Sequence, residues 1–78
     1  MTQLILYTTS ACHLCEQAAE NLQELQKSYS FDVKPLDISA DELLVEKYGI
    51  RIPVVRNNDL ARELGWPFNA EDIMGLLN

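Results

Sequence analysis

Hydrophobic and polar positions along this chain follow two different periods, and the changes of period divide it into short strands and helices. The first apolar run, Leu4–Tyr7, is continuous and is typical of a strand that is covered on both faces. From Cys12 to about Ser28 the spacing changes to three and four residues, which predicts an amphipathic helix. The apolar positions with this spacing are Leu14, Ala18, Leu22, Leu25 and Tyr29. We therefore expect a central strand followed directly by a helix.

The middle of the chain predicts a second strand and a second helix. Apolar and polar residues alternate over Phe31–Leu36, and Pro35, which has no N–H to donate, places this strand at an edge of the sheet. Ser39 and Glu42 have the spacing of a capping box at a helix start, and Gly49 is a typical helix end. The apolar residues expected to be buried in this helix are Leu43, Leu44 and Tyr48.

The last third of the chain predicts a hairpin and a final helix. Ile52–Val55 leads through the turn residues Asn57–Asp59 to a further strand, Leu60–Leu64. Asn69 can then cap a helix. Its apolar positions are Ile73, Met74, Leu76 and Leu77. The predicted order is β-α-β-α-β-β-α, an α/β fold in which a parallel pair and an antiparallel hairpin form a mixed four-stranded sheet with helices on both faces.

Composition and charge narrow the class of protein. The 78 residues are 47% hydrophobic, which suffices for one core, so we expect a single domain over residues 1–78. The net charge is −6 and the basic residues are scattered, which is not typical of proteins that bind nucleic acid or anionic membranes. The short N-terminal apolar run does not predict an export signal, and no segment is long enough to span a membrane. We expect a cytoplasmic monomer.

The acidic residues of the first predicted helix form a row along one side. They are Glu16, Glu20 and Glu24, spaced four residues apart. A row of like charges at this spacing is usually a solvated surface. We expect no substrate role for it.

Two cysteines, Cys12 and Cys15, carry the candidate chemistry. They follow a predicted strand and open a predicted helix, a context that makes a C-x-x-C motif a redox candidate. Residues one helical turn apart lie about 5 Å apart at Cα, within the range of about 4.4–6.8 Å in which a disulfide closes. Unpaired N–H groups in the first turn of a helix stabilise a thiolate. We therefore predict that Cys12 is the nucleophile and that Cys15 resolves the mixed disulfide.

Three segments resemble the short bacterial glutaredoxin-like proteins of the thioredoxin superfamily: Leu6–Cys15, Tyr48–Val54 and Leu64–Phe68. The resemblance covers nearly the whole chain and implies a thioredoxin-like fold and a thiol–disulfide oxidoreductase that transfers electrons through Cys12 and Cys15. It also implies that Pro53 is cis and lies beside the redox pair, and that the backbone of Ile52 contacts the substrate. Arg51 is a third candidate for substrate binding, through a substrate carboxylate.

The sequence departs from typical glutaredoxins in three places. It has His13 and Leu14 between the cysteines where they have Pro-Tyr, and threonines before the motif where they have a basic residue. It has only Gly65 where they have a glycine pair that receives glutathione. These departures predict that glutathione is a poor reductant here. We expect no bound cofactor or metal, and the expected partners are protein or small-molecule disulfides and a thiol reductant or reductase.

Two other functions stay open from the sequence. Cys12, Cys15 and His13 resemble part of a zinc or iron–sulfur site, but structural zinc usually needs four ligands, so this site would require a dimer or an external thiol. The chain is also compatible with a non-catalytic binding module of the thioredoxin fold.

Three residues near the motif have more than one interpretation. His13 either favours the thiolate of Cys12 or points to solvent. Trp66 and Phe68 are expected to pack rather than to bind substrate.

Overall fold

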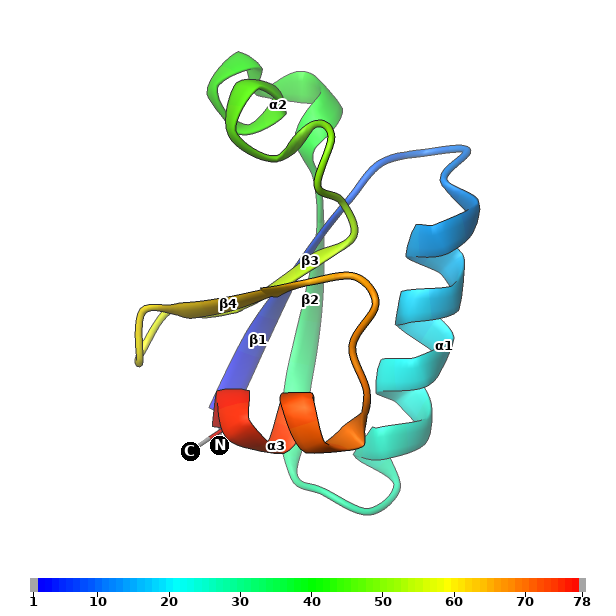
Figure 1. Ribbon diagram of the computed structural model, residues 1–78, viewed down its shortest axis with the longest axis vertical. Helices are drawn as coiled ribbons and strands as arrows, with labels where there is room; N and C mark the ends of the chain where they lie inside the picture. The colour runs from blue at the N-terminus through cyan, green and yellow to red at the C-terminus, as the bar shows by residue number, and fades with distance from the viewer. Residues whose placement is uncertain (1, 78) are drawn as a thin grey trace.

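The structure, a computed structural model, describes residues 2–77 as a mixed sheet of four strands with three α-helices (Figure 1). The elements are β1 (Thr2–Thr8), α1 (His13–Gln26), β2 (Phe31–Asp37), the 3₁₀ turn η1 (Ile38–Ala40), α2 (Glu42–Tyr48), β3 (Val54–Asn57), β4 (Arg62–Gly65) and α3 (Ala70–Leu77). The predicted order of strands and helices is confirmed. None of the helices in this part of the chain is both long and apolar enough to cross a membrane.

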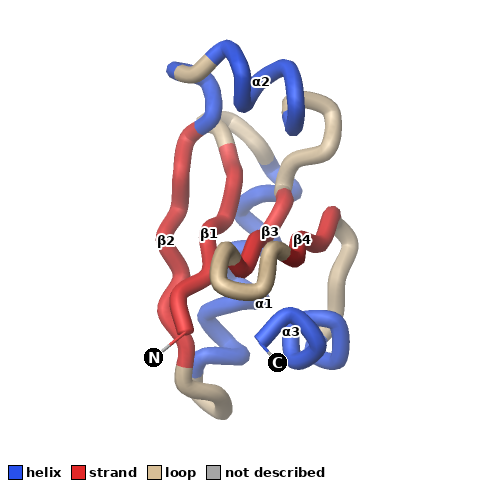
Figure 2. Tube along the Cα trace, turned by 90° about the vertical axis from the view of Figure 1, so that its left-hand side faces the viewer, coloured by secondary structure: helices blue, strands red, loops and turns tan. Residues whose placement is uncertain are grey.

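The sheet has the strand order β2-β1-β3-β4, and Figure 2 shows the strands in this order from left to right. β1 pairs in parallel with β2 and antiparallel with β3, and β3 pairs antiparallel with β4. β1 is therefore central and β2 lies at an edge, as the apolar run and Pro35 predicted. Leu6 is paired with Pro35 across β1 and β2, and Tyr7 is paired with Val54 across β1 and β3.

Each face of the sheet has its own core, because successive side chains of a strand point to opposite faces. Leu4 and Leu6 of β1 belong to the larger cluster, with residues of α1 and α3. Its buried members are Leu4, Leu6, Ala18, Leu22, Phe31, Val55, Phe68, Ile73 and Leu76. Tyr7 belongs to a smaller cluster with Ile38 of η1 and Tyr48 of α2. Helices therefore cover both faces of the sheet, as expected.

The buried side of α1 differs from the one predicted. Leu14 and Tyr29 were expected to be buried, but they are 46% and 37% exposed, and the helix ends at Gln26. The buried residues of α1 are Cys15, Ala18 and Leu22. Because neighbouring residues in a helix are about 100° apart, the inward position of Cys15 turns Leu14 away from the core.

The predicted capping box at Ser39 and Glu42 is wrong. Asp41 caps α2 instead, and its carboxylate accepts hydrogen bonds from the backbone N–H groups of Leu43 and Leu44 at 3.0 and 3.4 Å. Ser39 lies in the preceding 3₁₀ turn. Asp and Ser are equally good N-caps, so the sequence offered two starting points and the chain uses the later one. Leu43 is consequently in the first turn and is 76% exposed, not buried as predicted.

The C-terminal half follows the prediction more closely. Gly49 ends α2. Asn69 caps α3, because its side-chain oxygen accepts from the N–H of Asp72 at 2.9 Å while the Asp72 carboxylate accepts from the N–H of Asn69 at 3.0 Å. The hairpin of β3 and β4 forms, although β4 begins at Arg62 and Leu60 lies in the turn rather than in the strand.

A polar network joins α2 to the hairpin beside the smaller core. The Tyr48 hydroxyl donates to Glu63 at 2.8 Å, and the Tyr48 ring stacks on Tyr7 with the centroids 4.5 Å apart. Arg51 and Arg56 each donate to the Glu63 carboxylate at 3.2 Å. Partial burial alone would raise the pKa of Glu63, but the hydrogen bonds from its three partners outweigh it and hold that pKa below the usual value.

Removing the Glu63 charge should destabilise the fold in a pH-dependent way. Since the pKa of Glu63 is lowered by folding, its carboxylate stabilises the folded state above the unfolded pKa of about 4.5, and this contribution is lost as the pH falls through the folded pKa. Glu63→Gln should lower the free energy of unfolding by about 1–2 kcal/mol near neutral pH. Urea unfolding of both proteins at about pH 7 and about pH 3 measures the difference.

The matched control is Glu46→Gln, which removes an exposed carboxylate from α2. It should change stability little at either pH. A loss for Glu63→Gln that is equally large at both pH values would contradict the role given to the Glu63 carboxylate.

Candidate redox site

Cys12 directly precedes α1, and its sulfur caps the start of the helix. Its backbone is extended, with φ −106° and ψ 105°, and its Sγ accepts a hydrogen bond from the backbone N–H of Cys15 at 3.2 Å. Ser, Thr, Asp and Asn usually fill this position, because their oxygen accepts from an N–H group that has no partner within the helix. The Cys12 sulfur therefore occupies the place where the first turn of the helix favours a hydrogen-bond acceptor and negative charge.

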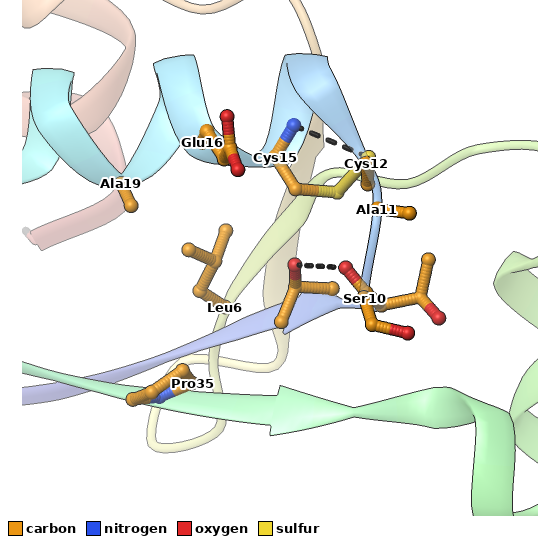
Figure 3. Close-up of a pocket in the computed structure, with 10 residues that line it drawn as sticks. Leu6, Ser10, Ala11, Cys12, Cys15, Glu16, Ala19 and Pro35 are labelled. Atoms are coloured by element: carbon orange, nitrogen blue, oxygen red, sulfur yellow. Dashed lines mark hydrogen bonds between the residues drawn. A yellow bond between two sulfur atoms is a disulfide. The ribbon is translucent and has the colours of Figure 1, made fainter.

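Cys12 and Cys15 form a disulfide in this structure, with the two Cα atoms 5.2 Å apart (Figure 3). This separation agrees with the helical spacing expected from the sequence. Cys12 is half-buried, whereas Cys15 is only 2% exposed and faces the core. A partner from solvent therefore meets Cys12 first. The division of roles between nucleophile and resolving cysteine stays a prediction that this arrangement suits.

Ala11 has an unusual backbone conformation directly before the motif. Its φ is 57°, in the left-handed region that favours glycine. The chain takes this conformation between the end of β1 and the start of α1, where it turns toward the helix. Nothing in the sequence signals it, since alanine is not a typical residue for a left-handed turn.

A pocket of about 250 Å³ lies beside the disulfide, and Figure 3 shows the residues around it. It is lined by Leu6, Thr8, Thr9, Ser10, Ala11, Cys12, Cys15, Glu16, Ala19 and Pro35. These residues come from β1, the loop after it, the start of α1 and the edge strand β2. No local pattern in the sequence indicates this pocket, because the pocket depends on the register that places Pro35 opposite Leu6.

Pro53 lies on the other side of β1 from the pocket. The Ile52–Pro53 peptide bond is cis, the form that the resemblance implies. Since Val54 is paired with Tyr7, the preceding residue Pro53 lies at the end of β1 from which the loop to Cys12 leaves. The Pro53 side chain is fully buried, so a substrate at this position would meet backbone groups.

Ile52 and Arg51 already have partners within the fold. The Ile52 N–H donates to the Tyr48 carbonyl at 3.0 Å. The Arg51 guanidinium donates to Glu63 and lies 5.5 Å from the centroid of the Tyr48 ring. These contacts explain where both residues are held, but their contact with a substrate stays a prediction.

Residues next to the motif behave as solvent-exposed or packed groups. The His13 side chain is 89% exposed, with Nδ1 3.9 Å from the Glu16 carboxylate, so His13 points to solvent, which was one of its two interpretations. Trp66 and Phe68 meet edge to face with the ring centroids 5.1 Å apart and pack in the larger core, as expected. The Trp66–Pro67 bond is also cis, which no pattern in the sequence predicted.

The described part of the chain contains no complete metal site. Among residues 2–77, no group of three or more His, Cys, Asp or Glu side chains is placed to hold a metal ion. Ligands for a metal at Cys12 and Cys15 would have to come from a second chain or from an external thiol.

Comparison with known proteins supports the resemblance over nearly the whole chain. Residues 3–78 match the family model described as Glutaredoxin-like domain (DUF836). The crystal structure of XcR50 from X. campestris is 39% identical, with a TM-score of 0.77 over 95% of this chain and 93% of that chain. The solution structure of Ne2328 from Nitrosomonas europaea is 32% identical, with a TM-score of 0.80 over 95% of this chain and 87% of that chain. No curated protein matches.

The left-handed conformation at Ala11 can be tested by substitution. Ala11→Gly should raise the free energy of unfolding by about 0.5–1 kcal/mol, because glycine avoids the steric cost of positive φ but adds some entropy to the unfolded chain. Denaturant unfolding of the oxidised proteins measures the change. As a control, Ala19→Gly changes a residue of ordinary helical conformation and should destabilise by about 1 kcal/mol. Equal losses in both variants would contradict strain at Ala11.

Proposed function

This chain belongs to the glutaredoxin-like domain family and has the thioredoxin-like fold, and we propose from this that it is a thiol–disulfide oxidoreductase acting through Cys12 and Cys15. The observation that carries the proposal is the hydrogen bond from the Cys15 N–H to the Cys12 sulfur at the start of α1. The same N–H favours a thiolate on Cys12 once the disulfide is reduced, as does the positive end of the helix dipole. The reduced Cys12 is thereby prepared to attack.

The exchange proceeds in two balanced steps. The Cys12 thiolate attacks one sulfur of the substrate disulfide, that bond breaks, and the other substrate sulfur leaves as a thiolate that takes a proton from water. Cys15 then loses its proton to water and attacks the Cys12 sulfur, the bond between Cys12 and the substrate breaks, and the second substrate sulfur leaves as a thiolate that takes a proton from water. Two electrons have passed to the substrate, and the protein holds the Cys12–Cys15 disulfide that the structure contains. A thiol or dithiol reductant restores the two thiols by the reverse exchange.

An extended substrate would contact the segment before β3. Pro53 has no N–H and its side chain is buried, and the Ile52 N–H is occupied by the Tyr48 carbonyl. The Ile52 carbonyl is therefore the group we propose to accept a hydrogen bond from the substrate backbone. Arg51 would bind a substrate carboxylate only in competition with Glu63.

The two cysteines should give opposite results when each is replaced. Cys15→Ser keeps the accessible Cys12 nucleophile and removes the resolving thiol, so it should accumulate covalent mixed disulfides with its substrates. Cys12→Ser removes the accessible sulfur, so it should trap few partners. Its rate of reducing a disulfide peptide should fall to the rate measured in buffer without protein. Non-reducing electrophoresis and a peptide reduction assay measure both effects.

Alkylation gives an independent check of the same mechanism. With limiting iodoacetamide at neutral pH, Cys12 of the reduced protein should be modified before Cys15, as read by mass spectrometry. Faster modification of Cys15, or activity retained by Cys12→Ser, would contradict the proposed mechanism.

Two other results would favour the alternative functions. A Cys12 that is alkylated but inert to every disulfide would favour a binding module. Visible absorbance after anaerobic purification would favour a metal cluster.

The source of electrons can be tested with the oxidised protein. We expect glutathione to reduce it slowly, because the chain lacks the glycine pair and the basic residue of typical glutaredoxins, and because Arg51 is held by Glu63. Parallel assays, one with glutathione and one with thioredoxin reductase and NADPH, compare how fast each electron donor reduces the disulfide. Efficient turnover of a glutathione mixed disulfide would overturn this expectation.

A further inference from the structure

The pocket beside the disulfide continues into a groove along the edge of the sheet. A second pocket of about 140 Å³ lies between α1 and β2 and shares Leu6, Ala19 and Pro35 with the first. The shared residues form a floor that runs from the redox pair toward Gln26 of α1. In Figure 3 this floor lies below α1 and reaches Pro35 on β2. The groove therefore begins at the sulfur atoms and extends away from them.

The first pocket combines an apolar floor with polar groups at its rim. Leu6, Ala19 and Pro35 provide hydrocarbon, and the loop after β1 provides hydroxyl groups. Glu16 is the only charged residue among those lining it, and its side chain is 73% exposed. Hydrocarbon beneath and a carboxylate at the rim suit a side chain that has an aliphatic stem and a cationic end.

The surroundings of the pocket add negative rather than positive charge. Asp37 lies near the pocket residue Thr9: the N–H and hydroxyl of Ser39, and to a lesser extent the Thr9 hydroxyl, hold the pKa of Asp37 below its usual value. Lys34 precedes Pro35 on β2 but is paired with Ile5, which packs against the smaller core on the other face. The strand alternation therefore directs Lys34 away from the pocket.

From these observations, and resting on the function proposed above, we propose that this pocket is a specificity site for a lysine or arginine side chain next to the reactive half-cystine of a polypeptide substrate. The aliphatic stem would lie on Leu6, Ala19 and Pro35, and the cationic group would meet Glu16. This revises the expectation from the sequence that its acidic row has no substrate role, because Glu16 lines the pocket and the other two glutamates of the row do not. A polypeptide is the preferred occupant because the groove continues past the first pocket, so it can follow more than one residue of an extended chain.

The position of the pocket permits this binding during exchange. Cys12 and Cys15 both line it, so a residue adjacent to the substrate sulfur in the mixed disulfide is within reach. The segment before β3 lies on the other side of β1, where it can contact the substrate backbone at the same time. The backbone contact would be common to all substrates, whereas the pocket would distinguish among them.

Three disulfide-linked peptides test the proposal, identical except for lysine, norleucine or glutamate beside the cysteine. Single-turnover reduction by the reduced protein gives the half-saturating concentration and the limiting rate for each. The lysine peptide should have a two- to fivefold lower half-saturating concentration than the norleucine peptide, the range expected for about 0.4–1 kcal/mol from an exposed ion pair, with an equal limiting rate. The glutamate peptide should bind more weakly than both.

Two substitutions separate the pocket from the general charge of the helix. Glu16→Gln should abolish the preference for lysine, and Glu16→Lys should reverse it toward glutamate. Glu20→Gln removes the same charge one turn further along α1, at an exposed residue that does not line the pocket, and should keep the preference. An equal loss of preference in Glu16→Gln and Glu20→Gln would overturn the assignment of the pocket.

The outcomes also distinguish this inference from the proposed function. Equal half-saturating concentrations for all three peptides with the wild-type protein would refute the specificity site and leave the exchange reaction standing. Failure to reduce any of the peptides would refute the oxidoreductase function itself, and the specificity site with it.

Discussion

The structure depends on how the first turn of α1 is capped. Backbone N–H groups at a helix start need acceptors, and here the sulfur of Cys12 receives the N–H of Cys15. Through this hydrogen bond Cys12 caps the helix, and Cys15 lies one turn further on, on the side that faces the core. The cap also places the accessible sulfur where the dipole of the helix favours negative charge. Capping, burial of Cys15 and the chemistry proposed for Cys12 are thus consequences of the same local geometry.

The central position of β1 determines what surrounds the sulfur atoms. With the strand order β2-β1-β3-β4, the loop that leaves β1 has β2 on one side and β3 on the other. The pocket forms toward β2, where Pro35 is opposite Leu6, and the Ile52–Pro53 segment lies toward β3. A substrate sulfur bonded to Cys12, as we propose, would therefore have two different surfaces within reach, one made of backbone and one made of side chains.

Local patterns predicted the order of the elements, the edge position of β2 and the spacing of the two cysteines, because each depends on neighbouring residues. The prediction was wrong where two local signals compete. Ser39 and Asp41 are both good caps, and the chain uses Asp41. The positive φ of Ala11 and the pocket could not be read from the sequence. The first is imposed by the connection between β1 and α1, and the second by a pairing register between distant segments.

The electrostatics of the site follow from how the fold uses its cations. Arg51 and Arg56 both donate to Glu63, which also accepts from Tyr48, so two of the 6 basic residues of the chain are engaged in holding α2 against the hairpin. Among the described residues that line the pocket, Glu16 is the charged one, and the carboxylate of Asp37 lies close to Thr9. An anionic substrate or reductant approaching the sulfur atoms from the pocket side would therefore meet like charge, whereas a cationic one would meet opposite charge. The two arginines thus stabilise the contact between α2 and the hairpin, while the carboxylates beside the pocket would favour a cationic partner.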